Sequence, residues 1–209
     1  MIRRHALLLA GLALGGCSVL PDRPYQESRR YALAPRRPQR NPPRGRGGPV
    51  LLVRSLRAAP GLDQRGLRSI GAEGQVSLAY WDEWAAPPAD AAEAALRGWM
   101  ADSGIFAAVV ASGSRLSGDV VIEAELVRLE AVPTQGVARA ALSVLALSDA
   151  ARDLVGQARI LAQVLAEGSA PLAGDSPAAM AAAMEAALGE ALASLERSLR
   201  PTLASSRRR

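Results

Sequence analysis

The chain has 209 residues, of which 49% are hydrophobic but only 3% aromatic, so its core must be built from leucine, valine and alanine. Apart from one histidine, its basic residues are 25 arginines, and there is no lysine. Against 20 acidic residues the arginines give a formal net charge of +5. Basic and aromatic side chains are not interleaved, so we expect no nucleic acid partner despite this charge.

The chain opens with a short apolar segment, residues 6–16, behind two arginines. This segment is too short to cross a bilayer as a helix, so we interpret residues 1–16 as a signal peptide. It ends in Leu14-Gly-Gly-Cys17, which resembles the bacterial lipobox. We therefore expect cleavage between Gly16 and Cys17, with a diacylglycerol and an N-acyl chain on Cys17. The alternative is an ordinary secreted protein whose lone cysteine falls at this position.

Lipidation at Cys17 has consequences for chemistry and for location. Ser18 follows the cysteine, whereas an aspartate there would resemble an inner-membrane retention signal, so we expect an anchor on the periplasmic face of the outer membrane. Removal of His5 and acylation of Cys17 leave no histidine and no free thiol. That excludes disulfides, metal sites of the His or Cys type, and the usual activated nucleophiles. We therefore expect that the protein is not an enzyme and has no catalytic residue, no metal, and no cofactor beyond the acyl chains on Cys17.

Residues 17–48 are rich in arginine, proline and glycine and are expected to form a disordered basic linker. About thirty residues of such a coil have a root-mean-square span of roughly 30 Å. Residues 18–57 carry a net charge of +8 and residues 58–200 a net charge of −8. Either the linker lies beside anionic lipid headgroups, or it is merely solvated. Tyr31-Ala-Leu33 is a short apolar island within it that can pair as an edge strand.

Residues 49–200 are expected to form one domain, followed by a basic tail, residues 201–209. Val50–Leu56 reads as a strand, and Pro60–Gly74 as a glycine-rich, charged connection. In the next strand Val76, Leu78 and Tyr80 alternate with polar or small residues, which predicts a half-buried strand with these three side chains toward the core.

A helix is predicted from Pro87-Pro88 to a stop at Gly104. Its apolar face consists of Ala92, Ala95, Leu96, Trp99, Met100 and Ser103. A short strand, Ile105–Val110, follows it.

Three longer strands come next, the first of them residues 119–131. Its apolar alternation slips by one residue after Leu126, which predicts a β-bulge. Val137–Leu147 is apolar on both faces and should lie centrally in the sheet, and Gln157–Glu167 alternates again.

The last helix should start at Asp175-Ser176-Pro177 and end at Pro201. Its apolar stripe is Met180, Met184, Leu188, Leu192, Leu195 and Leu199. This order of elements predicts an α+β fold: a single domain in which a mostly antiparallel sheet carries two helices on one face.

Three groups of residues stand out as candidate sites. Glu123 and Glu125 share one strand face, but nothing near them predicts a raised pKa, so we interpret them as a solvated face. Asp82-Glu83 is interpreted as a surface turn. Tyr80, Trp81 and Trp84 gather three of the chain's few aromatic side chains in five positions. They are candidate partner-docking residues, the alternative being core packing.

Taken in order, these features resemble the ABC-type transport auxiliary lipoprotein family, which includes the paraquat-inducible Pqi-type lipoprotein. The matching segments are the lipobox cysteine, Tyr31-Ala-Leu33, Val50–Leu56, Gly61-Leu-Asp-Gln-Arg65, Val76–Tyr80, Trp84-Ala-Ala-Pro87 and Arg115–Val120 with Leu129-Glu130. Together they span roughly residues 17–200.

The resemblance implies a non-enzymatic lipoprotein that accompanies an ABC permease and ATPase and a mammalian-cell-entry protein. Such a complex moves lipids or hydrophobic solutes between the two membranes. Another envelope-assembly lipoprotein, of the lipopolysaccharide-export or Tol type, is the alternative, and an envelope hydrolase is the weakest interpretation. Whether the chain forms a homo-oligomer stays open.

Overall fold

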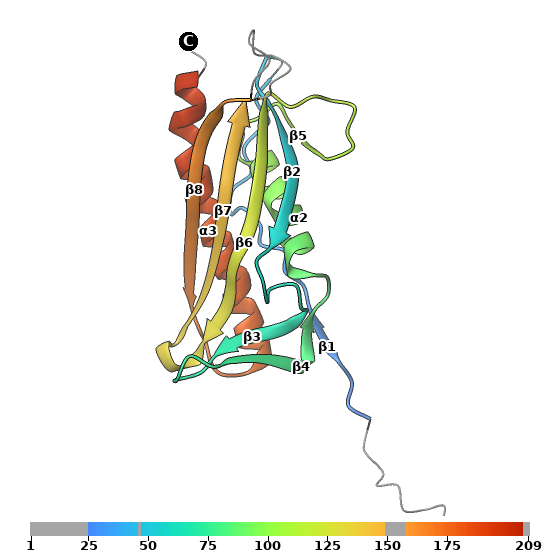
Figure 1. The fold of residues 1–209 in the computed structure, drawn as a ribbon, viewed down its shortest axis with the longest axis vertical. Coiled ribbons are helices and arrows are strands. Elements are labelled where there is room, and N and C mark those ends of the chain that lie inside the picture. Colours follow the sequence, from blue (N-terminus) through green and yellow to red (C-terminus); the bar gives the residue numbers. More distant parts are fainter. Residues whose placement is uncertain (1–24, 46, 149–157, 207–209) are drawn as a thin grey trace, which may run out of the picture.

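The computed structural model describes residues 25–45, 47–148 and 158–206, so the predicted signal peptide, Cys17 and the C-terminal Arg207–Arg209 lie outside the described residues. The fold is α+β and a single domain: one eight-stranded sheet carries two helices on one face (Figure 1). The strands are β1 (Arg29–Tyr31), β2 (Val50–Ala58), β3 (Gly66–Ile70), β4 (Val76–Trp84), β5 (Ala108–Ala111), β6 (Val120–Val132), β7 (Val137–Ser148) and β8 (Ile160–Pro171). The helices are α2 (Pro88–Asp102) and α3 (Pro177–Ser206), and a 3-10 turn, η2 (Pro133–Gln135), joins β6 to β7.

The sheet forks along β6. On one side β6, β7 and β8 form a long antiparallel meander, so β7 is central as predicted. On the other side the first part of β6 pairs in parallel with β2, and its end meets β3, where Ala131 pairs with Ser69. Beyond β2 lies β5; beyond β3 lie β4 and then β1. Antiparallel pairing predominates along the long strands, while these outer branches also contain parallel pairs.

The predicted bulge in β6 is present, because the register with β7 shifts between Leu126 and Arg128. Leu126 and Leu129, on either side of the shift, are both buried. One extra residue in β6 therefore keeps its apolar side toward the helices although the sequence alternation changes phase.

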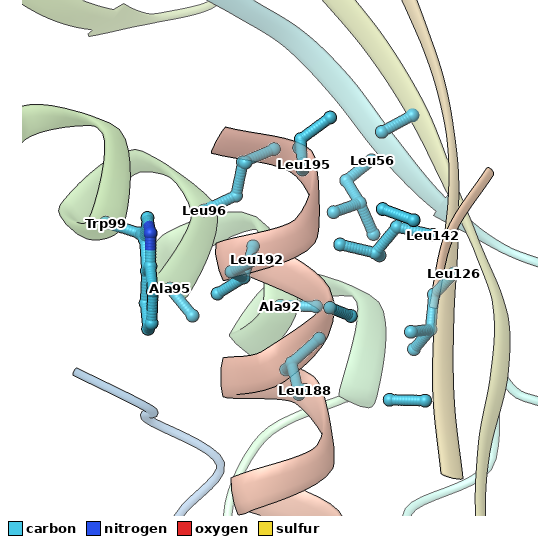
Figure 2. Close-up of a cluster of buried hydrophobic side chains, with 14 of the residues drawn as sticks. Leu56, Ala92, Ala95, Leu96, Trp99, Leu126, Leu142, Leu188, Leu192 and Leu195 are labelled. Carbon is cyan, nitrogen blue, oxygen red and sulfur yellow. The ribbon is translucent and has the colours of Figure 1, made fainter. Parts of the chain in front are cut away.

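The core lies between the sheet and the two helices, and leucine and alanine dominate it. Figure 2 shows Leu188, Leu192 and Leu195 of α3 between Leu96 of α2 and the sheet residues Leu126 and Leu142. The most apolar stretch of α3 has the length and hydropathy of a membrane span, but half of it is buried in the protein. Its hydrophobicity is thus used to cover the sheet.

Two secondary-structure predictions were wrong. Residues 60–74 contain the strand β3, which has only five residues. Leu67 is its only fully buried side chain, so the sequence shows no alternation of apolar and polar residues there. Helix α3 continues through Pro201 to Ser206. Proline removes one backbone donor, but Leu199 and Leu203 on either side are buried, and their packing holds the last turns in place.

The predicted disordered linker is also corrected, because residues 29–44 pack onto the domain. We name this segment the N-terminal strap. Leu33 is buried in the core, and the backbone N–H groups of Asn41 and Arg44 donate to the carbonyl oxygens of Asp102 and Phe106. The segment contains little apolar area of its own, but the charged groups of the domain beneath it hold it in place.

Candidate functional site

Those charges pair the strap with the domain. Four of its arginines lie within 2.8–2.9 Å of carboxylate oxygens: Arg29 with Asp82, Arg30 with Glu83, Arg37 with Glu196 and Arg40 with Asp102. The opposite net charges of the N-terminal segment and the domain are thus used within the molecule. The charge asymmetry of the sequence is the signal for this pairing, although we interpreted it as contact with lipid headgroups or with solvent.

Glu196 is the most buried of these carboxylates, with 6% of its surface exposed. It accepts hydrogen bonds from Arg37 Nε at 2.9 Å and Nη2 at 3.3 Å, from Trp99 Nε1 at 2.9 Å and from Arg200 Nε at 3.2 Å. Burial raises the pKa of Glu196, but the hydrogen bonds from Arg37, Arg200 and Trp99 outweigh it and hold the pKa below its ordinary value. This cluster ties the strap to both helices.

A second clamp joins the start of the strap to β4. Tyr31 Oη donates to Asp82 Oδ1 at 2.9 Å, and Arg29 Nη2 donates to Asp82 Oδ2 at 3.0 Å. Burial, with this hydrogen bond, raises the pKa of the Tyr31 phenol. Asp82 is 7% exposed within β4, so the prediction of a surface turn at Asp82-Glu83 was wrong. Of the segment Tyr31-Ala-Leu33, which the sequence offered as an edge strand, only Tyr31 lies in the edge strand β1, where it pairs with Trp84, while Leu33 lies beyond the strand in the core.

The candidate docking residues divide into one buried and two exposed side chains. Trp84 is 2% exposed and belongs to the core. Tyr80 is 82% exposed and Trp81 37%, and their rings meet edge to face with centroids 4.7 Å apart. Of the three candidates, only Tyr80 and Trp81 therefore form a surface.

An irregularity in β4 places these two rings outside. Gly66 pairs with Glu83 and Arg68 with Leu78, so only Leu67 of β3 lies opposite residues 79–82. A Cβ at Gly66 would lie 2.5 Å from the carbonyl oxygen of Ala79, so the bulged strand approaches β3 where glycine leaves room. A bulge re-aims side chains away from the regular pleat.

Val76 and Leu78 are exposed as well, so the prediction that Val76, Leu78 and Tyr80 face the core was wrong. The reason is that β4 lies at the far side of the fork and neither helix makes more than marginal contact with it. We name the four exposed side chains Val76, Leu78, Tyr80 and Trp81 the β4 patch.

Glu123 and Glu125, which we interpreted as a solvated face, lie on the side of β6 opposite the buried Ala124 and Leu126; Glu123 is half-buried and Glu125 is exposed. Glu123 Oε1 lies 2.6 Å from Arg54 Nη1, and its side chain is 39% exposed. Both glutamates line an open groove of about 480 Å³ together with Arg54, Arg57 and Leu145. Within residues 25–45, 47–148 and 158–206 no group of His, Cys, Asp and Glu is arranged to hold a metal ion.

A second groove, of about 430 Å³, runs between the strap and α2. Small residues of α2, among them Ala94 and Gly98, form its floor, and Arg36, Arg37 and Arg40 line its strap side. Two of these arginines are paired with carboxylates, so the groove presents little free charge.

Comparison with known proteins identifies the type of domain. The sequence model of the family described as "ABC-type transport auxiliary lipoprotein component" matches residues 31–195. The fold is similar to a crystal structure of a Xanthomonas campestris protein of family DUF330, with a TM-score of 0.66 and 24% identity, covering 85% of this chain and 96% of that one. An uncharacterized protein of known structure covers 83% of this chain and 99% of its own, at a TM-score of 0.61 and 15% identity. No curated protein matches the sequence.

Proposed function

This chain belongs to the ABC-type transport auxiliary lipoprotein component family, and we propose that it is the outer-membrane lipoprotein subunit of a transporter that also contains a mammalian-cell-entry protein. The family match carries the proposal, because it runs from residue 31 to residue 195 and so includes most of the strap as well as the domain. In this role the chain is non-enzymatic and assists the passage of lipids or hydrophobic solutes across the periplasm.

The strap shortens the segment that connects the folded domain to the lipid anchor that we propose at Cys17. Because the strap is clamped from Arg29 onward, only twelve peptide links separate the acylated cysteine from the folded domain. Fully extended, they reach about 40 Å; as a coil they span about 20 Å, less than the roughly 30 Å expected for a linker of about thirty residues. The domain is therefore held near the membrane by a short tether, and not by the longer coil that the sequence suggested.

The exposed side chains suit a protein that acts by binding another surface and not by catalysis. The carboxylates Glu123 and Glu125 lie toward solvent on the side of the sheet that the helices do not cover, and Glu123 is ion-paired with Arg54. The β4 patch, by contrast, exposes aromatic and aliphatic side chains that gain free energy when they are covered. We propose Tyr80 and Trp81 as the main residues of this contact surface.

The test is affinity purification of the full chain from detergent-solubilised membranes, with mass spectrometry of the proteins and lipids that accompany it. We expect an ABC permease, its ATPase and a mammalian-cell-entry protein. Recovery of lipopolysaccharide-export or Tol components in their place would overturn the proposal. The Cys17→Ala variant, purified in parallel, shows which partners depend on the anchor.

A further inference from the structure

Exposed apolar surface is concentrated in the β4 patch. In the part of the chain that the structure describes, eight large hydrophobic side chains are exposed. Four of them form the β4 patch within a stretch of six residues, and a fifth, Tyr25, is 90% exposed just before β1. Isolated exposed hydrophobic residues are normal, but such a cluster indicates a surface that is covered by something.

The cluster lies on the side of the domain where the anchored segment reaches it. Strand β1 pairs with the last three residues of β4, directly after Trp81, and Arg29 pairs with Asp82. In Figure 1, β3 and β4 form one end of the molecule, and residues 25–28, which precede β1, run outward from this same end. The end of α3 and the loop between β5 and β6 lie at the opposite end.

The chemistry of the patch suits a lipid interface better than a purely electrostatic contact. The neighbouring arginines Arg29 and Arg30 already face Asp82 and Glu83, so they offer little free positive charge. Tyrosine and tryptophan combine an apolar ring with a polar group, and membrane proteins concentrate them at the level of the lipid headgroups. Val76 and Leu78 add aliphatic area beside the aromatic rings.

We propose that the β4 patch rests in the headgroup region of the bilayer that holds the acyl chains of Cys17. This inference depends on the lipid anchor of the proposed function. The tether of about 40 Å at most keeps the patch within reach of that bilayer, and confinement raises its effective concentration there. Contact too weak to bind a free domain is then sufficient to orient the anchored one, with the β5–β6 loop pointing away from the membrane.

The three tryptophans allow a direct test, because Trp84 and Trp99 are buried and only Trp81 is substantially exposed. The full-length lipidated protein is reconstituted into vesicles of phosphatidylethanolamine with a minor share of phosphatidylglycerol, with and without bromine on the acyl chains. Brominated lipid should quench part of the tryptophan emission. The Trp81→Phe variant should lose this quenching while it keeps the emission of the two buried rings.

A matched control moves the reporter to the other end of the molecule. Leu116 is 57% exposed in the β5–β6 loop, so a variant with Trp81→Phe and Leu116→Trp carries its exposed ring there. Its emission should not be quenched. Equal quenching of the two reporters, or no quenching of the wild-type protein, would overturn the proposal. So would protection of Trp81 by a transporter subunit or a second copy without any effect of brominated lipid.

Mass spectrometry of Cys17 in the same sample separates the two hypotheses. If Cys17 carries acyl chains and Trp81 is not quenched, the membrane contact is wrong while the anchored subunit stands. If Cys17 carries none, the anchor of the proposed function fails and the membrane contact fails with it.

Discussion

The indole nitrogen of Trp99 donates a hydrogen bond of 2.9 Å to Oε2 of Glu196, and this bond joins α2 to α3 inside the core. The same oxygen accepts from Arg37 of the strap, so one carboxylate connects three segments that lie far apart in the sequence.

Replacing Glu196 by glutamine should therefore destabilise the whole domain. The change leaves Arg37, whose side chain is only 15% exposed, without its ionic partner. Breaking a buried ion pair in this way costs about 3 kcal/mol, which denaturant unfolding of the two proteins would measure. Arg54→Gln, which breaks a much more exposed pair with Glu123, is the control and should cost less than about 1 kcal/mol. Equal effects of the two changes would contradict the central role of Glu196.

The contribution of Glu196 should also depend on pH. Its pKa in the folded protein lies below the ordinary value of 4.5. The carboxylate therefore stabilises the fold fully above about pH 4.5, and this stabilisation is lost as the pH falls through the lower, folded-state pKa. The difference in unfolding free energy between wild type and Glu196→Gln should shrink on acidification below pH 4.5. A difference that stays constant there would show that Glu196 does not titrate with folding.

The strap should be visible in amide hydrogen exchange. The N–H groups of Asn41 and Arg44 are hydrogen-bonded to Asp102 and Phe106, so they should exchange more slowly than neighbouring strap amides. Glu196→Gln should accelerate both. Free exchange throughout residues 35–45 would restore the view of this segment as an unstructured linker.

Cys17→Ala should remove the protein from the outer-membrane fraction and leave an uncleaved or soluble precursor. The reason is that the thiol accepts the diacylglycerol on which processing and anchoring depend. Fractionation and intact-mass measurement test this, with Ser18→Ala as the matched control that should be processed normally. A Cys17→Ala protein that is cleaved and still anchored would end the lipoprotein interpretation.

Substitution of the carboxylates Glu123 and Glu125 should distinguish a binding role of the protein from a catalytic one. Glu123→Gln and Glu125→Gln should leave transport intact, because both side chains face solvent. Trp81→Ala should leave the protein anchored through Cys17 but weaken its co-purification with the transporter, because the domain loses the contact that orients it. Loss of transport from either carboxamide, with folding and assembly unchanged, would reveal chemistry on the open face of the sheet.

Two glycines should respond in opposite directions to alanine. At Gly168 of β8 a Cβ would lie 2.2 Å from the carbonyl oxygen of Ala187, so Gly168→Ala must push α3 off the sheet. Gly98 of α2 has open space around its Cβ position, and there alanine should stabilise the helix by about 1 kcal/mol. Thermal unfolding of the two variants measures both effects, and a neutral Gly168→Ala would show that the helix and sheet are less closely packed.

The sequence could predict the elements that carry their own periodic pattern. The stripe on α3, the face of α2 and the phase slip in β6 all depend on neighbouring residues, and each is found where the pattern placed it. What could not be predicted depends on residues distant in the chain. The exposure of Leu78 and Tyr80 follows from the absence of a helix over β4, and the packing of the strap follows from carboxylates such as Glu196, 159 residues after Arg37. Alternation in a strand shows that two faces differ, but not which face a helix will cover.

The 159 residues between Arg37 and Glu196 also set an order of events in folding. The strap cannot find its place on the two helices until α3 has formed, because Glu196, the acceptor for Arg37, belongs to α3. A contact between residues so far apart in the sequence carries the entropic cost of closing a long loop. Docking of the strap should therefore follow the packing of α3 onto the sheet and complete the fold.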